Sequence, residues 1–147
     1  RFQMKVPRPS HRRLRGRVSD LAIGADGRPV ISLYDNTTHA NQTTEFNLKL
    51  LRCADVACTS SSAVIVDETA DVGQHNSVAI RSNGMPVIAY RAEGTKSLRV
   101  AHCTDEKCLA KTSTLIDSAS NTGEYVELII GADASGSWLT TISLQIR

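Results

Sequence analysis

The sequence predicts an all-β fold built from tandem repeats, and three observations support this prediction. Two long stretches of the chain match each other motif by motif. Each stretch divides into four short runs rich in Val, Ile and Leu, separated by turn residues, which is typical of β-strands. No segment shows the 3.6-residue periodicity and the capping residues of a helix.

The internal repeat is visible in three pairs of segments. Residues 21–34 (LAIGADGRPVISLY) match 78–91 (VAIRSNGMPVIAYR), 47–58 (NLKLLRCADVAC) match 97–108 (SLRVAHCTDEKC), and 63–67 (AVIVD) match 113–117 (STLID). The offset between the copies is 57 residues at first and 50 later, so the first copy holds about seven extra residues near 36–46. A third copy opens at 128–133 (LIIGAD) and ends near 142–144 (ISL). Such repetition indicates duplication of one structural unit.

Each full copy is expected to form four strands joined by recognisable turns. The expected strands are 21–23, 29–34, 48–53 and 63–67 in the first copy, and 78–80, 86–90, 98–103 and 113–117 in the second. Between the first two strands lie Asp26-Gly27 and Asn83-Gly84, dipeptides that favour the positive φ values of tight hairpins. Pro29 and Pro86 fall at the first residue of the second strand, where a missing N–H is tolerated.

Four short antiparallel strands repeated about every 50 residues are the sequence form of a β-propeller blade. A β-sandwich is the alternative, although sandwich strands need not repeat their sequence. We expect a basic N-terminal arm or linker at 1–17 and propeller repeats over 18–147, with blades at about 19–67 and 76–117 and a half-blade at about 125–145. Propellers usually need four to eight blades. About two and a half blades therefore predict an incomplete propeller, either a fragment or a protomer whose ring closes by oligomerisation.

The repeat also resembles a known class of proteins. The pattern IGADGRPVISLYD, LKLLRCADVAC, VIVD and DVGQHNSVAI is similar to tandem repeats of secreted bacterial β-propeller proteins, which are loosely akin to sialidase-type Asp-box propellers. The resemblance covers about residues 19–145 and implies a secreted or extracytoplasmic protein, at the cell surface or in the periplasm. The second copy departs from the first at Arg81 in place of Gly24 and at Arg91 in place of Tyr34, and the third copy lacks the turn proline.

Composition and charge exclude some classes of function. No stretch approaches the ~20 apolar residues of a membrane span, so none is expected. Residues 1–17 hold seven Lys or Arg and no acid, whereas the other 130 residues carry ten basic and fifteen acidic groups. Such an arm suits contact with a polyanion or an acidic membrane surface, and a solvated linker is the alternative. Because no aromatic pattern is interleaved and the body has no basic face, no nucleic-acid partner is expected.

The four cysteines occupy matching places in the two copies. Cys53 and Cys58 form one C-x4-C motif, and Cys103 and Cys108 form the other. Three pairings are possible, and the repeat favours two local disulfides because each pair lies in one loop after the third strand. Free buried thiols and a four-thiolate zinc site are the alternatives, but equivalent loops of adjacent blades splay apart with radius. Disulfides in turn imply an oxidising compartment.

One face of the expected propeller gathers most of the polar loops. Loops between the second and third strands, and linkers between blades, share a face, and here they are 35–46, 67–77, 91–97 and 117–125. The seven-residue insertion falls on this face, and insertions in repeats usually map to a binding face. Surface loops are also polar for general reasons. The candidate ligand-face residues are His39, Asp71, His75, Arg91, Glu93, Glu124 and Tyr125.

Metal-binding patterns are weak. His39, His75 and His102 do not recur between the copies and share no metal-like spacing; His75 aligns with Tyr125. The acidic loop 67–71 offers oxygen atoms for calcium, but it lacks alternating ligand spacing. No metal and no cofactor are therefore expected.

These observations favour a non-catalytic binding or scaffold module of an exported protein, whose loops contact a glycan or protein ligand. The sequence has no nucleophile elbow, P-loop or H-E-x-x-H motif. The alternative is a fragment of a sialidase-like, glycoside-active propeller whose catalytic residues lie outside this segment. Asp71 and Glu124 are the nearest approach to a glycosidase carboxylate pair. A sialidase would also need a cluster of arginines to bind the substrate carboxylate, and three aligned arginines are not visible in the repeats. The expected partners are a carbohydrate or protein ligand and the remaining blades of a larger chain or a homo-oligomer.

Overall fold

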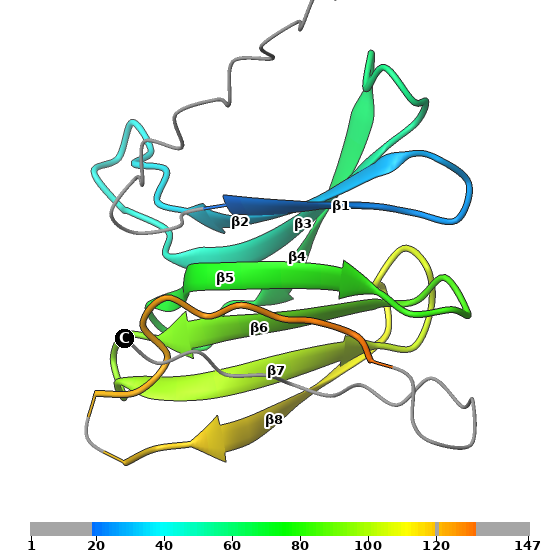
Figure 1. Ribbon diagram of the computed structural model, residues 1–147. Helices are drawn as coiled ribbons and strands as arrows, with labels where there is room; N and C mark the ends of the chain where they lie inside the picture. Colours follow the sequence, from blue (N-terminus) through cyan, green and yellow to red (C-terminus); the bar gives the residue numbers. More distant parts are fainter. Residues whose placement is uncertain (1–18, 120, 132–147) are drawn as a thin grey trace, which may run out of the picture.

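The computed structural model describes residues 19–119 and 121–131 and contains two four-stranded antiparallel sheets (Figure 1). The first sheet consists of β1 (Ser19–Ile23), β2 (Pro29–Asp35), β3 (Asn47–Cys53) and β4 (Ser61–Asp67). The second consists of β5 (Val72–Ile80), β6 (Pro86–Ala92), β7 (Ser97–Cys103) and β8 (Lys111–Asp117). In both sheets each strand pairs with the next one along the chain. The all-β prediction is confirmed for the described residues.

No helix that is long and apolar enough to cross a membrane occurs in residues 19–119 and 121–131.

The eight strands contain the eight predicted runs, and seven of them extend beyond the run by one or two residues, whereas β5 begins six residues earlier. β5 begins at Val72, whereas the sequence placed residues 67–77 in a loop. The pairing of β5 with β6 shifts register between Val72 and Gln74 and again before Ser77. Such bulges break the alternation by which a strand is recognised in a sequence. Residues 121–131 form no regular strand, and both the remainder of the predicted half-blade and the basic arm lie outside the described residues.

The hairpin turns of the two sheets have the same hydrogen bonds at equivalent residues. The Gly27 amide donates to the Gly24 carbonyl, and the Gly84 amide donates to the Arg81 carbonyl, both at 2.9 Å. Gly27 and Gly84 have φ values of 77° and 80°, the conformation that the two predicted dipeptides favour. The repeated motifs therefore form repeated local structure.

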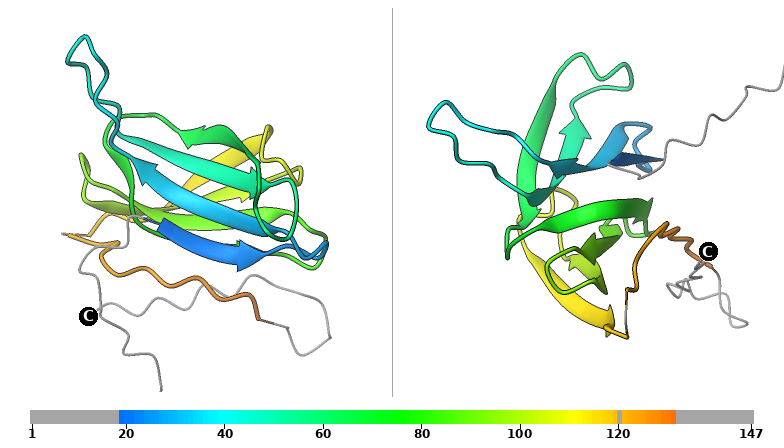
Figure 2. Two further views of the ribbon diagram at one scale, coloured as in Figure 1. Left: turned by 90° about the horizontal axis from the view of Figure 1, so that it is seen from above. Right: turned by 90° about the vertical axis from the view of Figure 1, so that its left-hand side faces the viewer.

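The two sheets pack face to face, and strand alternation decides which side chains meet (Figure 2). Val30, Leu48 and Leu50 of the first sheet belong to one buried cluster with Val78 and Ile88 of the second. Each of these strands turns every second side chain toward the other sheet. This cluster is the core between the sheets.

A second buried cluster lies on the opposite face of the second sheet. It joins Val87, Ala89, Leu98 and Val100 with Val126 and Leu128. One repeat earlier, the four sheet positions are Val30, Ser32, Leu48 and Leu50, and these face the second sheet. The segment 121–131 therefore contacts the second sheet through the same positions by which the first sheet contacts the second. Figure 1 shows this segment alongside β5.

Equivalent hydrogen bonds join β1 to β5, and β5 to the segment 121–131. The Val78 amide donates to the carboxylate of Asp20 at 3.0 Å, and the Leu128 amide donates to the hydroxyl of Ser77 at 3.1 Å. Asp20 and Ser77 are equivalent residues, as are Val78 and Leu128. We call the contact of β1 with β5 the first joint and the contact of β5 with residues 121–131 the second joint. The two joints share this hydrogen bond, with a carboxylate acceptor in the first and a hydroxyl acceptor in the second.

A buried polar pair distinguishes the first joint from the second. The Ser32 hydroxyl donates to Oδ1 of Asn76 at 2.6 Å, and Nδ2 of Asn76 donates to the Gly73 carbonyl at 2.8 Å. Ser32 and Asn76 are fully buried. At the second joint the equivalent residues are Ala89 and Val126, which lie in the second apolar cluster. A hydrogen-bonded pair and an apolar pair therefore fill the same place.

The Ser32–Asn76 pair predicts a coupled effect on stability. Asn76→Val alone should lower the free energy of unfolding by about 1–3 kcal/mol, because it leaves a buried hydroxyl without its acceptor. Adding Ser32→Ala should restore part of the loss, giving an interaction free energy of about 0.5–3 kcal/mol in a double-mutant cycle. Urea unfolding with intact disulfides measures all four proteins. Strict additivity would show that the two residues do not interact in solution.

The start of β5 passes very close to the first sheet. Gly73 has a φ of 104°, and a Cβ added to it would lie 2.9 Å from Cα of Leu48. Gly123 makes the equivalent crossing with a φ of 88°, and its added Cβ would lie 3.4 Å from Cα of Leu98. Only glycine fits the first crossing, because the obstacle there is backbone.

Replacing the glycine at the first crossing should therefore be costly. Gly73→Ala should lower the free energy of unfolding by at least about 1–3 kcal/mol, the cost of a strained φ, with the backbone clash in addition. Gly123→Ala should cost less because its neighbours are farther away. Gly94→Ala is the matched control: its added Cβ meets nothing within 4 Å, so we expect a change within about 0.5 kcal/mol. Urea unfolding of the three variants checks this order, and equal costs for Gly73→Ala and Gly94→Ala would contradict it.

Candidate functional site

A buried arginine organises the polar side chains where the second sheet meets residues 121–125. Arg91, on β6, is only 2% exposed. Its Nε lies 2.5 Å from the Glu93 carboxylate, and Nη1 lies 3.7 Å from that of Glu124. Nη1 also donates to the Thr122 carbonyl at 2.8 Å, and Nη2 donates to Oδ1 of Asn121 at 2.9 Å. The guanidinium charge is therefore fully paired, as burial of an arginine requires.

The Glu93 carboxylate of this cluster is held in its charged form. The hydrogen bond from Arg91 lowers the pKa of Glu93 below its ordinary value, and the positive charges of Arg91 and Lys96 act in the same direction. A charge-assisted bond of this kind is stronger than one between neutral groups. Glu93 thus presents a negative charge beside a buried positive one.

The corresponding place at the first joint holds a different pair. The Tyr34 hydroxyl donates to the Asp71 carboxylate at 2.8 Å, and Nε2 of Gln74 lies 3.3 Å from the same oxygen. Tyr34 is equivalent to Arg91, and Asp71 is equivalent to Asn121. A phenol that donates to a carboxylate is thus replaced, one repeat later, by a guanidinium that donates to an amide.

Two aromatic side chains at equivalent positions contact each other across the second joint. The rings of His75 and Tyr125 lie 5.3 Å apart at 60°, within the range of favourable edge-to-face contacts. Their φ values are 48° and 56°, a left-handed conformation that is uncommon outside glycine and often found at functional sites. Tyr125 is 47% exposed. The contact therefore leaves one ring open to solvent.

His75 lies between opposing charges. Burial lowers its pKa below the ordinary value, Arg91 adds to the lowering, and the negative charges of Glu124 and Glu93 act in the opposite direction. Nδ1 of His75 is buried and has no hydrogen-bond partner among the described residues. The His75 ring is therefore neutral at pH 7, so its contact with Tyr125 places no second positive charge beside Arg91.

The structure brings most of the predicted ligand-face residues together at this joint. His75, Arg91, Glu93, Glu124 and Tyr125 form one cluster, and Asp71 adjoins it through its carbonyl, which accepts a 2.8 Å bond from the Glu93 amide. We call the five residues the joint cluster.

His39 stands apart from the joint cluster. It lies on the hairpin 36–46, which contains the insertion and projects from the first sheet (Figure 2). Its Nε2 lies 3.0 Å from the Glu45 carboxylate of the same hairpin. The sequence placed His39 correctly in a loop but gave no sign that this loop rises away from the others.

Sequence reasoning missed Tyr34, Gln74 and Asn121 as members of these networks. A signal was nevertheless present, because the two copies differ at both ends of one bond: Tyr34 becomes Arg91 while Asp71 becomes Asn121. Paired differences of this kind between repeats indicate contact.

The opposite edge of the sheets carries the disulfides, as the repeat predicted. Cys53 pairs with Cys58 and Cys103 pairs with Cys108, each with a Cα–Cα distance of 4.8 Å. No cysteine is free, so neither the free-thiol alternative nor the four-thiolate zinc site applies. Among the described residues no group of three or more His, Cys, Asp or Glu side chains could hold a metal.

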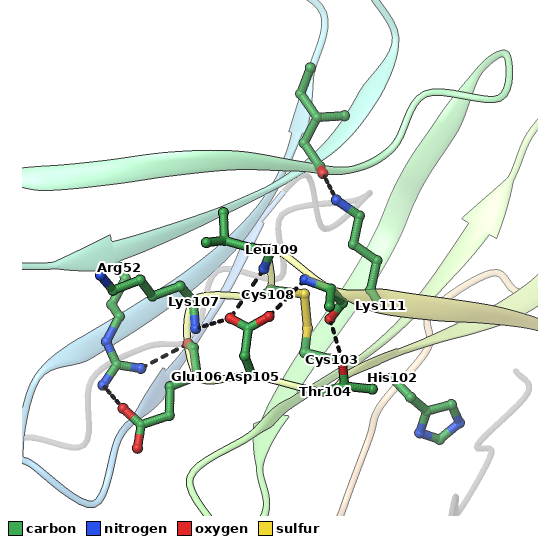
Figure 3. Close-up of a disulfide and its surroundings, with 12 residues drawn as sticks. Arg52, His102, Cys103, Thr104, Asp105, Glu106, Lys107, Cys108, Leu109 and Lys111 are labelled. Atoms are coloured by element: carbon green, nitrogen blue, oxygen red, sulfur yellow. Dashed lines mark hydrogen bonds and ion pairs between the residues drawn. A yellow bond between two sulfur atoms is a disulfide. The ribbon is translucent and has the colours of Figure 1, made fainter.

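The second disulfide loop also fastens the two sheets together (Figure 3). Arg52 of the first sheet donates to the Glu106 carbonyl at 3.0 Å and pairs with its carboxylate at 3.3 Å. Lys111 donates to the Ile65 carbonyl at 2.6 Å. Within the loop, Asp105 accepts backbone bonds, first among them that from Ala110, which lower the pKa of its carboxyl. This edge is therefore occupied by structural contacts.

In comparisons with known proteins, no family model matches the sequence and no curated protein is similar to it.

The Tyr34–Asp71 bond predicts a distinctive alkaline titration. Burial, and then the bond to Asp71, raise the pKa of Tyr34 from 10.0 to about 12. A raised folded-state pKa means that this contribution to stability is fully present below pH 10 and is lost as the pH rises toward 12. In a phenolate absorbance titration of the folded protein, Tyr34→Phe should remove one group that ionises near pH 12, and it should weaken the fall in stability between pH 10 and 12. An unchanged high-pH limb would show that the bond is absent in solution.

Proposed function

We propose that the two sheets are blades of a β-propeller and that the chain is a non-catalytic binding module of an exported protein. The blade assignment is supported by the repeated joint. Consecutive repeats use the same sheet positions, the same glycine crossing and the same hydrogen bond from a backbone amide at the start of the repeat. Sheets related in this way add radially, as blades do.

The observation that carries the binding proposal is the joint cluster. A half-exposed tyrosine ring and two carboxylates lie at one place, on the edge where the sheets' longer loops gather. Carboxylate oxygens accept hydrogen bonds from hydroxyl groups, and an exposed ring offers an apolar face to the C–H side of a sugar. The ligand class that this combination suits best is a neutral carbohydrate.

The cluster is also well supported from behind. Arg91 holds Glu93, Glu124 and the Thr122 carbonyl at once, and its own position on β6 is fixed by burial. Binding groups held by paired partners on a strand lose little freedom when a ligand arrives. The buried arginine is thus a positioning residue for the carboxylates.

Export is supported by the disulfides. Bonds of this kind persist in oxidising compartments and are rare where thiols are kept reduced. We therefore place the module outside the cytoplasm, at a cell surface, in a periplasm or in the medium.

Carbohydrate binding can be measured directly by titration calorimetry with cellopentaose, chitopentaose and mannopentaose. At least one of the three should bind saturably, and Tyr125→Ala should weaken it at least tenfold, a loss of about 1.4 kcal/mol. Tyr125→Phe keeps the ring and should retain most of the affinity. His39→Ala is the matched control, because His39 belongs to the same set of loops but lies outside the joint cluster.

Two outcomes would contradict the proposal. Binding that survives Tyr125→Ala and is lost in His39→Ala would move the site to the projecting hairpin. Release of product from fluorogenic glycosides by the purified chain would contradict a non-catalytic module and favour the glycoside-active alternative.

A further inference from the structure

The first sheet has an apolar face that points away from the second sheet. Leu21, Ile31 and Leu51 form a row of direct cross-strand neighbours over β1, β2 and β3. Ile23 and Leu33 lie on the same side by strand alternation. Leu21 and Ile23 are 53% and 57% exposed, and the other three are partly exposed. We call these five residues the outward face.

The equivalent row of the second sheet is covered. Val78, Ile88 and Ala101 are cross-strand neighbours in the same way, and they are 5%, 0% and 1% exposed. They are buried because the first sheet packs on them. The same row of the repeat is therefore buried in the second sheet, where the first sheet packs on it, and exposed in the first sheet, where no described sheet covers it.

The disulfides show the same difference. Cys103 and Cys108 belong to the core between the sheets and are fully buried. Of the equivalent pair, Cys53 is buried but Cys58 is partly exposed. The first sheet thus carries a joint surface, bridge included, of the kind that the second sheet uses.

We infer that the outward face is a docking surface for a further four-stranded sheet of the same repeat class. This inference rests on the blade arrangement of the proposed function but not on its ligand. It defines the chemistry of the occupant from the joint already present. The occupant presents apolar side chains at the positions of Val30, Leu48 and Leu50, and an oxygen acceptor at the position of Asp20 for the Leu21 amide.

The occupant differs from the first sheet in one respect. At the existing joint the Tyr90 hydroxyl donates to the Asp67 carboxylate at 2.5 Å. The outward face has Leu33 in place of Tyr90, so the occupant has no hydroxyl to accept there. An apolar or small residue at the position of Asp67 fits this place better than a carboxylate, whose burial without a partner is costly.

The two described sheets of a second copy do not supply such a surface. In the first sheet, Val30, Leu48 and Leu50 are covered by the second sheet. In the second, their equivalents are buried together with Val126 and Leu128. Neither of these two faces of another copy is therefore open to form the existing joint with the outward face.

The test adds a repeat and asks whether the outward face becomes protected. Residues 19–75, with Asp67→Ala in the added copy, are duplicated directly before Ser19, which keeps the register because Ser19 follows His75 in the place of Asn76. The readout is the alkylation rate of a thiol introduced by Leu21→Cys in the original copy. Leu115→Cys is the matched control, since Leu115 is also 53% exposed but lies on β8. We expect alkylation at position 21 to slow at least tenfold in the extended chain, and alkylation at position 115 to stay the same.

A second variant separates docking from mere proximity. Val30→Asp and Leu50→Asp, introduced only in the added copy, should return alkylation at position 21 to its rapid rate. An added copy that leaves position 21 rapidly alkylated overturns the inference, because this copy presents the apolar side chains of the existing joint and lacks the Asp67 carboxylate that the outward face cannot pair.

The remaining outcomes are equally decisive. Protection at position 21 that grows with the concentration of the unextended chain overturns the inference in favour of a second copy. Calorimetry with the three oligosaccharides, repeated on the same proteins, reports on the joint cluster separately. Protection at position 21 without binding of any of the three oligosaccharides would contradict the ligand proposal alone. Oligosaccharide binding without protection at position 21 would contradict the docking surface alone.

Discussion

The close approach of the start of β5 to the backbone of Leu48 is the constraint on which the rest of the structure depends. Because Gly73 has no Cβ, the chain passes against the backbone of the first sheet and enters β5 in a fixed register. A shift of one residue would turn every side chain of that strand to its other face. Val78 would then leave the core and Ser77 would lose Asp20. The apolar core, the hydrogen bond from the Val78 amide to Asp20 and the position of His75 all depend on this register.

The two joints show how a repeated architecture accepts different chemistry. Between the copies, a buried serine and asparagine become alanine and valine, and a tyrosine with a carboxylate becomes an arginine with an amide. In each case both partners differ and the backbone arrangement is the same. Polar groups taken from water need their partners, so a change on one side alone would leave a group unsatisfied. The second joint consequently holds more charge than the first, and the joint cluster lies there.

Much of the fold could be predicted because the repeat states each feature twice. The strand runs, the hairpin glycines and the cysteine pairs recur at fixed offsets, and all of them occupy the expected places. The start of β5 at Val72 could not be predicted, because bulges interrupt its alternation. The Tyr34–Asp71 bond joins residues 37 positions apart, and no local pattern indicates it. The alignment of His75 with Tyr125 gave their equivalence but not their ring contact, and the separation of His39 depends on the direction of one hairpin.

The unequal burial of the two disulfides has a consequence for their chemistry. A thiol reductant must reach a sulfur atom along the bond that it breaks, so the reaction is slow wherever packed side chains block the approach. Cys103 and Cys108 are enclosed between the sheets, whereas Cys58 opens partly to solvent. The first bridge can therefore be attacked in the intact fold, while the second opens to attack only when the sheets separate. Reduction of the Cys53–Cys58 disulfide should therefore depend on the reductant around the folded protein, and reduction of the Cys103–Cys108 disulfide on the rate at which the sheets separate.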